Sequence, residues 1–198
     1  VRMAGEGISL PLMEYAAKQL GMPVGPLQLI DETSIDLANQ IAKATKTALG
    51  TKYIEDASDE ILAFMVNEQR LGRKSNAGFY NYDEKGKRID LWNGLSNNWP
   101  IRDQQPNVEE VKMRLALIQA LEAVRAFEEG VLTDIREGDV GAVLGWGCLP
   151  WAGGPFGWLD LLGSKNVLDT CNQFFADHGK RFQAPKILET MAKSNKQF

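Results

Sequence analysis

VGAVLGWGCLPWAGGPFGWL, residues 140–159, runs between Asp139 and Asp160 without one charged residue. The stretch contains six glycines, two prolines and three tryptophans. A run of about 20 uncharged residues is long enough to cross a bilayer as a helix. However, glycine, proline and bulky indoles would break such a helix and leave backbone groups unpaired in lipid. We therefore interpret the stretch as a buried, glycine-rich elbow between helices, and we expect no membrane span.

A weaker copy of this elbow, GMPVGPLQLID, occupies residues 21–31. Each copy contains Gly-Pro, four further residues and then Asp. The structural elbow residues that we predict are Gly25, Pro26 and Asp31 in the first copy and Gly154, Pro155 and Asp160 in the second. The copies are 129 positions apart (154 − 25 and 160 − 31), with no gap between them. We expect Asp31 and Asp160 to cap or brace the elbows. Chance similarity of two helix-elbow-helix segments is the alternative.

Composition excludes several classes of function. The chain has 198 residues, of which 44% are apolar, and its 26 acidic and 22 basic residues give a net charge of −4. Without a basic block we expect no nucleic-acid partner, because phosphate binding needs a concentrated basic face. Cys148 and Cys171 form no CxxC pair and are typical of buried thiols in an intracellular protein. Asp134, Glu137 and Asp139 have no His or Cys partners, so we expect no metal site.

Apolar residues at helical spacing predict helices along most of the chain. In the first half we expect helices over residues 9–20, 36–49 and 58–71, with the apolar stripe of the second formed by Leu37, Ile41, Ala44 and Ala48. We expect the third to be capped by Ser58 or Asp59 and closed by Gly72. Asn76 and Gly78 suit a left-handed backbone, and residues 77–82 suit one short extended segment or hairpin.

Residues 83–107 have the composition of a linker, since Gly and Pro interrupt any period, but Trp92 and Trp99 suggest that it is pinned to a surface. Residues 108–129 give the clearest helix, which we expect to be central. Further helices are predicted over residues 133–144, 167–175 and 185–191. The fold class predicted is all-α, built from two related helical modules over residues 1–95 and 106–198.

The repeat also predicts a helix that the first module lacks. In the second module the central helix ends at Glu129-Gly130, and Glu6-Gly7 is the matching position in the first. Only five residues precede Glu6, so the first module is without the N-terminal central helix of about 20 residues that the second contains. We expect the natural polypeptide to continue upstream, and we expect residues 1–30 to associate with a second chain or with the missing domain, because a module without this helix exposes a core face.

Three motifs in order make nearly the whole chain resemble a known family. RLGRKSNAGFYNYDEKG, residues 70–86, looks like the Gly-Phe-Tyr signature of 3-hydroxyacyl-CoA dehydrogenases, with Asn76 where the family usually has Gly. GMPVGPLQLID resembles the elbow of their C-terminal helical domain, with Val24 in place of the usual Met. Residues 128–163 are similar to the second C-terminal repeat of multifunctional fatty-acid oxidation alpha subunits.

The resemblance implies part of an NAD-dependent oxidoreductase that oxidises (S)-3-hydroxyacyl-CoA in β-oxidation, in the cytoplasm of a bacterium or an organelle matrix. The family's catalytic residues and its NAD site lie in segments that have no counterpart here, so we expect this chain to bind no cofactor, to contain no catalytic residue and to be inactive alone. The implied partners are an acyl-CoA substrate, the upstream dinucleotide-binding domain and a second copy in a homo-oligomer. Pro23, Gly25, Pro26 and Leu27 are the implied substrate-cleft candidates.

Other candidate sites have ordinary explanations. His178, the only histidine, lies at a predicted helix end, where it suits the helix dipole better than a substrate. Arg73 and Lys74 could approach the phosphates of CoA, but a solvated helix terminus explains them too. Gly145-x-Gly147 does not open a Rossmann unit. The alternative function that the residues leave open is a stand-alone helical module for dimerisation or docking, without catalysis.

Overall fold

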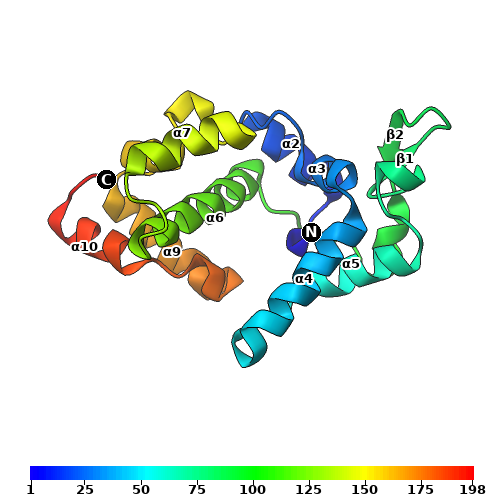
Figure 1. The fold of residues 1–198 in the computed structure, drawn as a ribbon, viewed down its shortest axis with the longest axis horizontal. Helices are drawn as coiled ribbons and strands as arrows, with labels where there is room; N and C mark the ends of the chain where they lie inside the picture. Colours follow the sequence, from blue (N-terminus) through cyan, green and yellow to red (C-terminus); the bar gives the residue numbers. More distant parts are fainter. The chain divides into compact units, whose positions relative to one another are not determined.

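The computed structural model describes residues 1–198, and 66% of them are helical. The predicted all-α class is confirmed, since the only sheet is the antiparallel pair of β1 (Tyr80–Tyr82) and β2 (Arg88–Leu91) (Figure 1). The extended segment expected near residues 77–82 contains β1. Its partner β2 lies in the segment with the composition of a linker, residues 83–107.

The chain folds into two compact units. The first contains residues 1–17 and 24–108, and the second contains residues 18–23 and 109–198. Our predicted boundaries did not anticipate that residues 18–23 fold with the second unit. Leu20 is the reason: its side chain is buried in the second core, and its carbonyl accepts a hydrogen bond of 2.9 Å from the indole N–H of Trp151.

The first unit is built from short helices and the hairpin. Its α-helices are α1 (Arg2–Gly5), most of α2 (Leu10–Gln19), α3 (Pro26–Thr33), α4 (Ile35–Leu49) and α5 (Ala57–Asn67). Its 3₁₀ turns are η1 (Gly50–Lys52), η2 (Arg73–Ser75) and η3 (Asn93–Asn97). α4 lies against α5 in this unit (Figure 1).

Several local predictions for the first unit were wrong. α4 exists, but its predicted apolar stripe is exposed, and Ile35 and Asn39 are the residues it buries. The cap of α5 is Asp56, whose side chain forms a capping box with Asp59, and α5 ends before the Gly72 that we expected to close it. Asn76 is left-handed as predicted, with φ 54°, whereas Gly78 is not.

The segment predicted to be a linker is packed against the first unit. Trp92 stacks on Phe64 with ring centroids 6.2 Å apart, and Trp99 meets the same ring edge-on at 5.3 Å. Leu95 between them is buried. The prediction that both tryptophans pin this segment is confirmed.

The second unit surrounds one long helix. Its elements are α6 (Val108–Glu128), α7 (Ile135–Trp146), η4 (Pro150–Ala152), α8 (Pro155–Leu162), α9 (Ser164–His178), η5 (Lys180–Phe182) and α10 (Lys186–Ser194). Ala116, Leu117, Ala120, Leu121 and Val124 of α6 are completely buried in a core shared with α7 to α10. The central role predicted for this helix is confirmed.

The uncharged stretch forms the end of α7, the turn η4 and most of α8. Gly147 ends α7 in the left-handed region, and Leu149 and Gly153 bracket η4 in the same region. Trp146 donates its indole N–H to Gln119 at 3.2 Å. None of the chain's helices combines the length and the apolar character that a bilayer span needs.

The two units repeat the same helices in one register. α3 and α8 each have 8 residues, α4 and α9 each have 15, and both pairs start 129 positions apart (155 − 26 and 164 − 35). α5 and α10 also start 129 positions apart (186 − 57). Ser34 and Gly163, at equivalent positions, share a positive φ of 92° and 81°. The repeat read from two short elbows therefore extends over three consecutive helices.

Replacing Phe156 by alanine should destabilise the second unit by about 3–5 kcal/mol, because this ring is 1% exposed and its loss leaves a cavity. Phe156 also lies edge-on to Phe127 and Phe198. Guanidinium unfolding followed by circular dichroism measures the change. Phe175→Ala is the matched control, since Phe175 is 43% exposed. Similar losses in the two variants would contradict the assigned core.

Candidate functional site

The first elbow is held by a carboxylate from the preceding helix. Gly25, the N-cap of α3, has no side chain to cap the helix, and Pro26 at the first helical position has no backbone N–H. Leu27 therefore supplies the first free backbone donor. Oε1 of Glu14, on α2, accepts that N–H at 2.7 Å, and Glu14 is buried. A remote side chain thus replaces the missing local cap.

The second elbow uses the same arrangement. Gly154 and Pro155 open α8 as Gly25 and Pro26 open α3. The carboxylate of Asp139, on α7, accepts the backbone N–H of Phe156 at 2.8 Å and that of Gly157 at 3.2 Å. Neither role is predicted from the sequence, in which Glu14 belongs to no motif and Asp139 is weighed only as a metal ligand. Burial and capping depend on how the elbow helix approaches, so no local signal in the sequence marks either carboxylate.

The glycine before each proline is required by the approach of these carboxylates. A Cβ at Gly25 would lie 2.0 Å from Oε2 of Glu14. A Cβ at Gly154 would lie 2.5 Å from Oδ1 of Asp139, and its φ of 118° disfavours any other residue. Both elbows therefore depend on close contact between a backbone and a carboxylate.

Asp31, at the sixth position of α3, anchors the Gly-Phe-Tyr signature. It is 1% exposed, and its carboxylate accepts the backbone N–H groups of Phe79 at 2.8 Å and Tyr80 at 2.9 Å and the hydroxyl of Tyr82 at 3.0 Å. Gly78 is needed here because a Cβ would lie 2.2 Å from Oδ1 of Asp31. Asp31 thus braces the hairpin and not only the elbow. Gly78 is needed because it leaves room for the carboxylate, and its own backbone is not left-handed.

Burial dominates the electrostatics of these carboxylates. Desolvation raises the pKa of Asp31, although its backbone and tyrosine donors oppose the change. Desolvation also raises the pKa of the Tyr82 hydroxyl, and the neighbouring Asp31 charge adds to it. Burial likewise raises the pKa of Asp139. Paired donors offset the cost of taking these carboxylates wholly or partly out of water.

Two more polar side chains complete the network in the first unit. The second oxygen of Glu14 accepts the hydroxyl of Tyr80 at 2.8 Å, which links the elbow to the hairpin. Arg70 donates to the carbonyls of Gly78 at 2.9 Å and Tyr80 at 3.2 Å, and its guanidinium lies 4.1 Å from the ring centre of Trp92. The signature residues therefore belong to a structural hydrogen-bond network in which each of these polar side chains has a partner, and it contains no unpaired nucleophile or base.

The structure divides the four substrate-cleft candidates between the units. Pro23 is exposed and belongs to the second unit, where a Cβ at Gly147 would lie 3.1 Å from its Cδ. Gly25, Pro26 and Leu27 belong to the first unit, in which Pro26 is partly exposed and Leu27 is fully buried. Their role in a cleft stays a prediction.

The remaining candidates have local partners. Arg73 pairs with Glu32 at 3.0 Å and Lys74 with Asp36 at 2.6 Å, so both cations beside the signature are engaged. Asp160 accepts the backbone N–H of Phe198 at 2.9 Å and does not cap α8.

His178 and the Gly145-x-Gly147 pattern are both explained by helix ends. His178, at the end of α9, lies 3.8 Å from Glu110 and edge-on to Phe174 and Phe182. Gly145 and Gly147 stand at the end of α7 and not between a strand and a helix.

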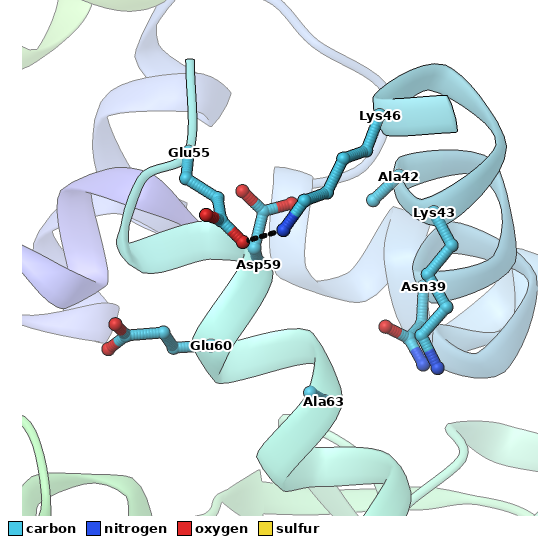
Figure 2. Close-up of a pocket in the computed structure, with 8 residues that line it drawn as sticks. All are labelled: Asn39, Ala42, Lys43, Lys46, Glu55, Asp59, Glu60 and Ala63. Atoms are coloured by element: carbon cyan, nitrogen blue, oxygen red, sulfur yellow. Dashed lines mark hydrogen bonds and ion pairs between the residues drawn. The ribbon is translucent and has the colours of Figure 1, made fainter. Parts of the chain in front are cut away.

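Each unit has a hollow between two of its helices. A cleft of 260 Å³ lies between α4 and α5 and is lined by both charged and small residues, among them Ala42, Lys46 and Asp59 (Figure 2). Figure 2 shows Lys46 paired with Glu55 across it. An apolar groove of 560 Å³ lies between α6 and α7, with Trp146 at one side.

The residues present do not fit a dinucleotide. Such a cofactor is bound by a parallel βαβ unit with a glycine-rich turn. The only two strands of this chain form an antiparallel hairpin, so we assign no NAD-binding residue. His, Cys, Asp and Glu side chains form no group of three or more that could hold a metal ion.

Gly154→Ala should destabilise the second unit by about 2 kcal/mol or more, because the new Cβ meets Asp139 and the φ is strained. Gly141→Ala is the matched control. Gly141 lies within α7, and a Cβ there meets nothing within 4 Å, so alanine should be neutral or stabilising by up to about 1 kcal/mol. Thermal unfolding of the two variants measures the change in stability. An alanine at position 154 that leaves the stability unchanged would refute the close contact with Asp139.

Glu14→Ala should cost about 1–3 kcal/mol for each buried donor that it leaves unpaired, the N–H of Leu27 and the hydroxyl of Tyr80. Tyr80→Phe removes only the hydroxyl and should cost less. Because the two side chains share one bond, the double variant should be less destabilised than the sum of the single variants. Denaturant unfolding gives the three values, and strict additivity would show that the bond contributes nothing.

The comparisons with known proteins agree with this arrangement. Residues 1–82 match the family described as 3-hydroxyacyl-CoA dehydrogenase, C-terminal domain. The chain is similar to 3-hydroxybutyryl-CoA dehydrogenase from Escherichia coli K12, with a TM-score of 0.68 and 17% identity over 98% of this chain and 57% of that one.

A second solved structure is the dehydrogenase part of multifunctional enzyme 1 from C. elegans. It has a TM-score of 0.61 and 17% identity over 90% of this chain and 41% of that one. The chain thus spans about half the length of the structures it matches, and at this identity the likeness shows the fold alone. The family match includes the elbow of α3, Asp31 and the Gly-Phe-Tyr segment that Asp31 holds. Residues 1–82 are therefore similar to 3-hydroxyacyl-CoA dehydrogenase C-terminal domains.

Proposed function

We propose that this chain is the C-terminal helical portion of an NAD-dependent (S)-3-hydroxyacyl-CoA dehydrogenase of fatty-acid β-oxidation. The observation that carries the proposal is the family match of residues 1–82, which ends on the hairpin strand anchored by Asp31. The substrate class and the cofactor come from the family and belong to the intact enzyme. Its compartment would be the cytoplasm or an organelle matrix.

The second unit supports an origin in a multifunctional polypeptide. Its helices α8, α9 and α10 repeat α3, α4 and α5 at a constant spacing of 129 positions (155 − 26). Its elbow is held by Asp139 as the first is held by Glu14. Two C-terminal helical repeats in series are the arrangement that the sequence resembles.

The contribution we propose for this chain is binding and contact, not chemistry. Every carboxylate of the elbow network is engaged by backbone or tyrosine donors, so none is free to act as a general base. Pro26 offers a partly exposed apolar surface at the start of α3, backed by the buried Leu27. That surface suits one wall of an acyl-CoA cleft, for which Gly25 and Leu27 are the other candidates in the same unit.

The partners proposed are a dinucleotide-binding domain and a second copy of the polypeptide. Exposed apolar side chains support such contacts: Ile41 of α4 is 57% exposed and Leu144 of α7 is 80% exposed.

The test compares the chain with the natural full-length product of its gene. We expect the full-length protein to reduce NAD with a 3-hydroxyacyl-CoA substrate, and the chain alone to show neither turnover nor saturable NAD binding by tryptophan fluorescence. Tight NAD binding by the chain would contradict the proposal. A gene whose reading frame starts near Val1 would favour a stand-alone docking module without catalysis.

A further inference from the structure

The turn that follows α6 in the second unit has a counterpart after α1 in the first. Gly130 and Gly7 each donate their backbone N–H to the carbonyl three residues earlier, at 3.1 and 3.0 Å. Their φ values are 73° and 81°. The next residues, Val131 and Ile8, each donate to the carbonyl five residues earlier, at 2.9 and 3.0 Å. The two turns therefore have the same backbone, 123 positions apart (130 − 7).

In the first unit a segment of the same chain covers this turn. The segment, residues 99–105, lies outside the helices and strands. The backbone N–H of Arg102 and the side-chain amide of Gln105 both donate to the carbonyl of Gly7 at 2.9 Å. A Cβ on Gly7 would lie 2.7 Å from Cγ of Arg102. Beneath this segment Ile8 is only 1% exposed.

In the second unit no part of the chain covers the same turn. A Cβ on Gly130 would meet no atom within 4 Å, and Val131 is 74% exposed. The carbonyl of Gly130 accepts no hydrogen bond, whereas that of Gly7 accepts two. The turn borders the apolar groove of about 560 Å³ between α6 and α7, which Val131 and Leu132 line. The two turns therefore differ in the segment that lies on them and not in their own backbone.

The groove beside the uncovered turn is a preformed apolar surface. Ile118 and Ala123 of α6 and Ala142 of α7 line it. Trp146 lines it too and is 59% exposed, and its indole N–H donates to Gln119 at 3.2 Å. Because this bond already holds the ring, a side chain that packs against it orders little else.

The rim of the groove is acidic. Glu122 of α6 and Glu137 of α7 line it and are exposed, and its lining contains no lysine, arginine or histidine. Arg125 pairs with Glu122 at 3.2 Å, but it also donates to the carbonyls of Arg181 and Gln183 beside η5. The rim therefore keeps a net negative charge. It repels the phosphates of a coenzyme A and attracts a lysine or an arginine.

We propose that the groove between α6 and α7 is a docking site for an extended segment of a partner protein, in which an apolar side chain lies next to a lysine or an arginine. The apolar side chain packs against Trp146, and the cation pairs with Glu122 or Glu137. A backbone N–H of the segment donates to the carbonyl of Gly130, as that of Arg102 does to the equivalent carbonyl in the first unit. The inference rests on the repeated turn and on charge, and it uses no property of the dehydrogenase reaction.

The test uses a peptide with the sequence of residues 99–105, which already binds the equivalent turn. The peptide is capped at both ends and carries Asp103→Asn, so that its net charge is positive. Added to the ¹⁵N-labelled chain, it should cause saturable NMR shifts of the Gly130 amide and the Trp146 indole N–H, with a dissociation constant below about 1 mM. A peptide that also carries Arg102→Glu should bind about tenfold more weakly or worse.

Two variants of α7 form a matched pair. A Cβ at Gly141 or at Gly145 meets no atom within 4 Å, but only Gly141 lines the groove. Gly141→Leu should therefore fill the groove and weaken peptide binding by about tenfold or more, whereas Gly145→Leu should bind the peptide as the parent chain does.

A third variant keeps the test decisive if Gly141→Leu does not fold. Val131→Lys changes a residue that is 74% exposed, so the fold should remain, and its cation should repel the peptide. The proposal is overturned if the peptide at millimolar concentration shifts neither Gly130 nor Trp146, or if it shifts only residues of the first unit. Equal binding of the Arg102→Glu peptide, or undiminished binding by Gly141→Leu or Val131→Lys, also overturns it.

Discussion

A carboxylate that accepts a backbone N–H at the start of an elbow helix is the constraint on which both units depend. A helix that begins Gly-Pro has neither a side chain at its N-cap nor an N–H at its first position, so its positive end needs an acceptor from elsewhere. Glu14 supplies it in the first unit and Asp139 in the second, at 2.7 and 2.8 Å. Because the carboxylate must come within contact distance of the backbone, the residue before the proline can only be glycine. The conspicuous composition of the elbows is a consequence of this one contact.

The two elbows diverge at the sixth residue of the elbow helix. Asp31 is buried beneath the hairpin and holds Phe79, Tyr80 and Tyr82, whereas Asp160 is partly exposed and binds only the backbone of Phe198. The hairpin exists in the first unit alone. The Gly-Phe-Tyr signature is thus the partner of a buried carboxylate. The motif by which the sequence resembles 3-hydroxyacyl-CoA dehydrogenases therefore has a structural cause.

The sequence predicted features that depend on the spacing of residues along the chain. It missed features that depend on which segments come into contact in the folded protein. Helix positions, the central role of α6 and the left-handed Asn76 follow from residues close together in the chain, and the repeat of 129 follows from the likeness of two short stretches. Glu14 could not be found in this way, because a glutamate within a helix is ordinarily a solvated side chain, and only the approach of α3 makes it a cap. The face of α4 was wrong for the same reason: its strongest apolar stripe, with Leu37 and Ile41, is not the face that packs.

The comparison of the two units separates the effect of sequence from the effect of neighbours. α4 and α9 have the same length, the same positive φ at the residue before them and equivalent helices on either side. Their exposed fractions nevertheless differ, because only α9 has a long helix lying on it. Where the core is complete, its positions hold valine, cysteine and phenylalanine; where the face is open, they hold alanine, alanine and threonine. Side chains of that size leave α4 enough intrinsic helix propensity and enough contact with α5 to remain folded, but they form no core of their own.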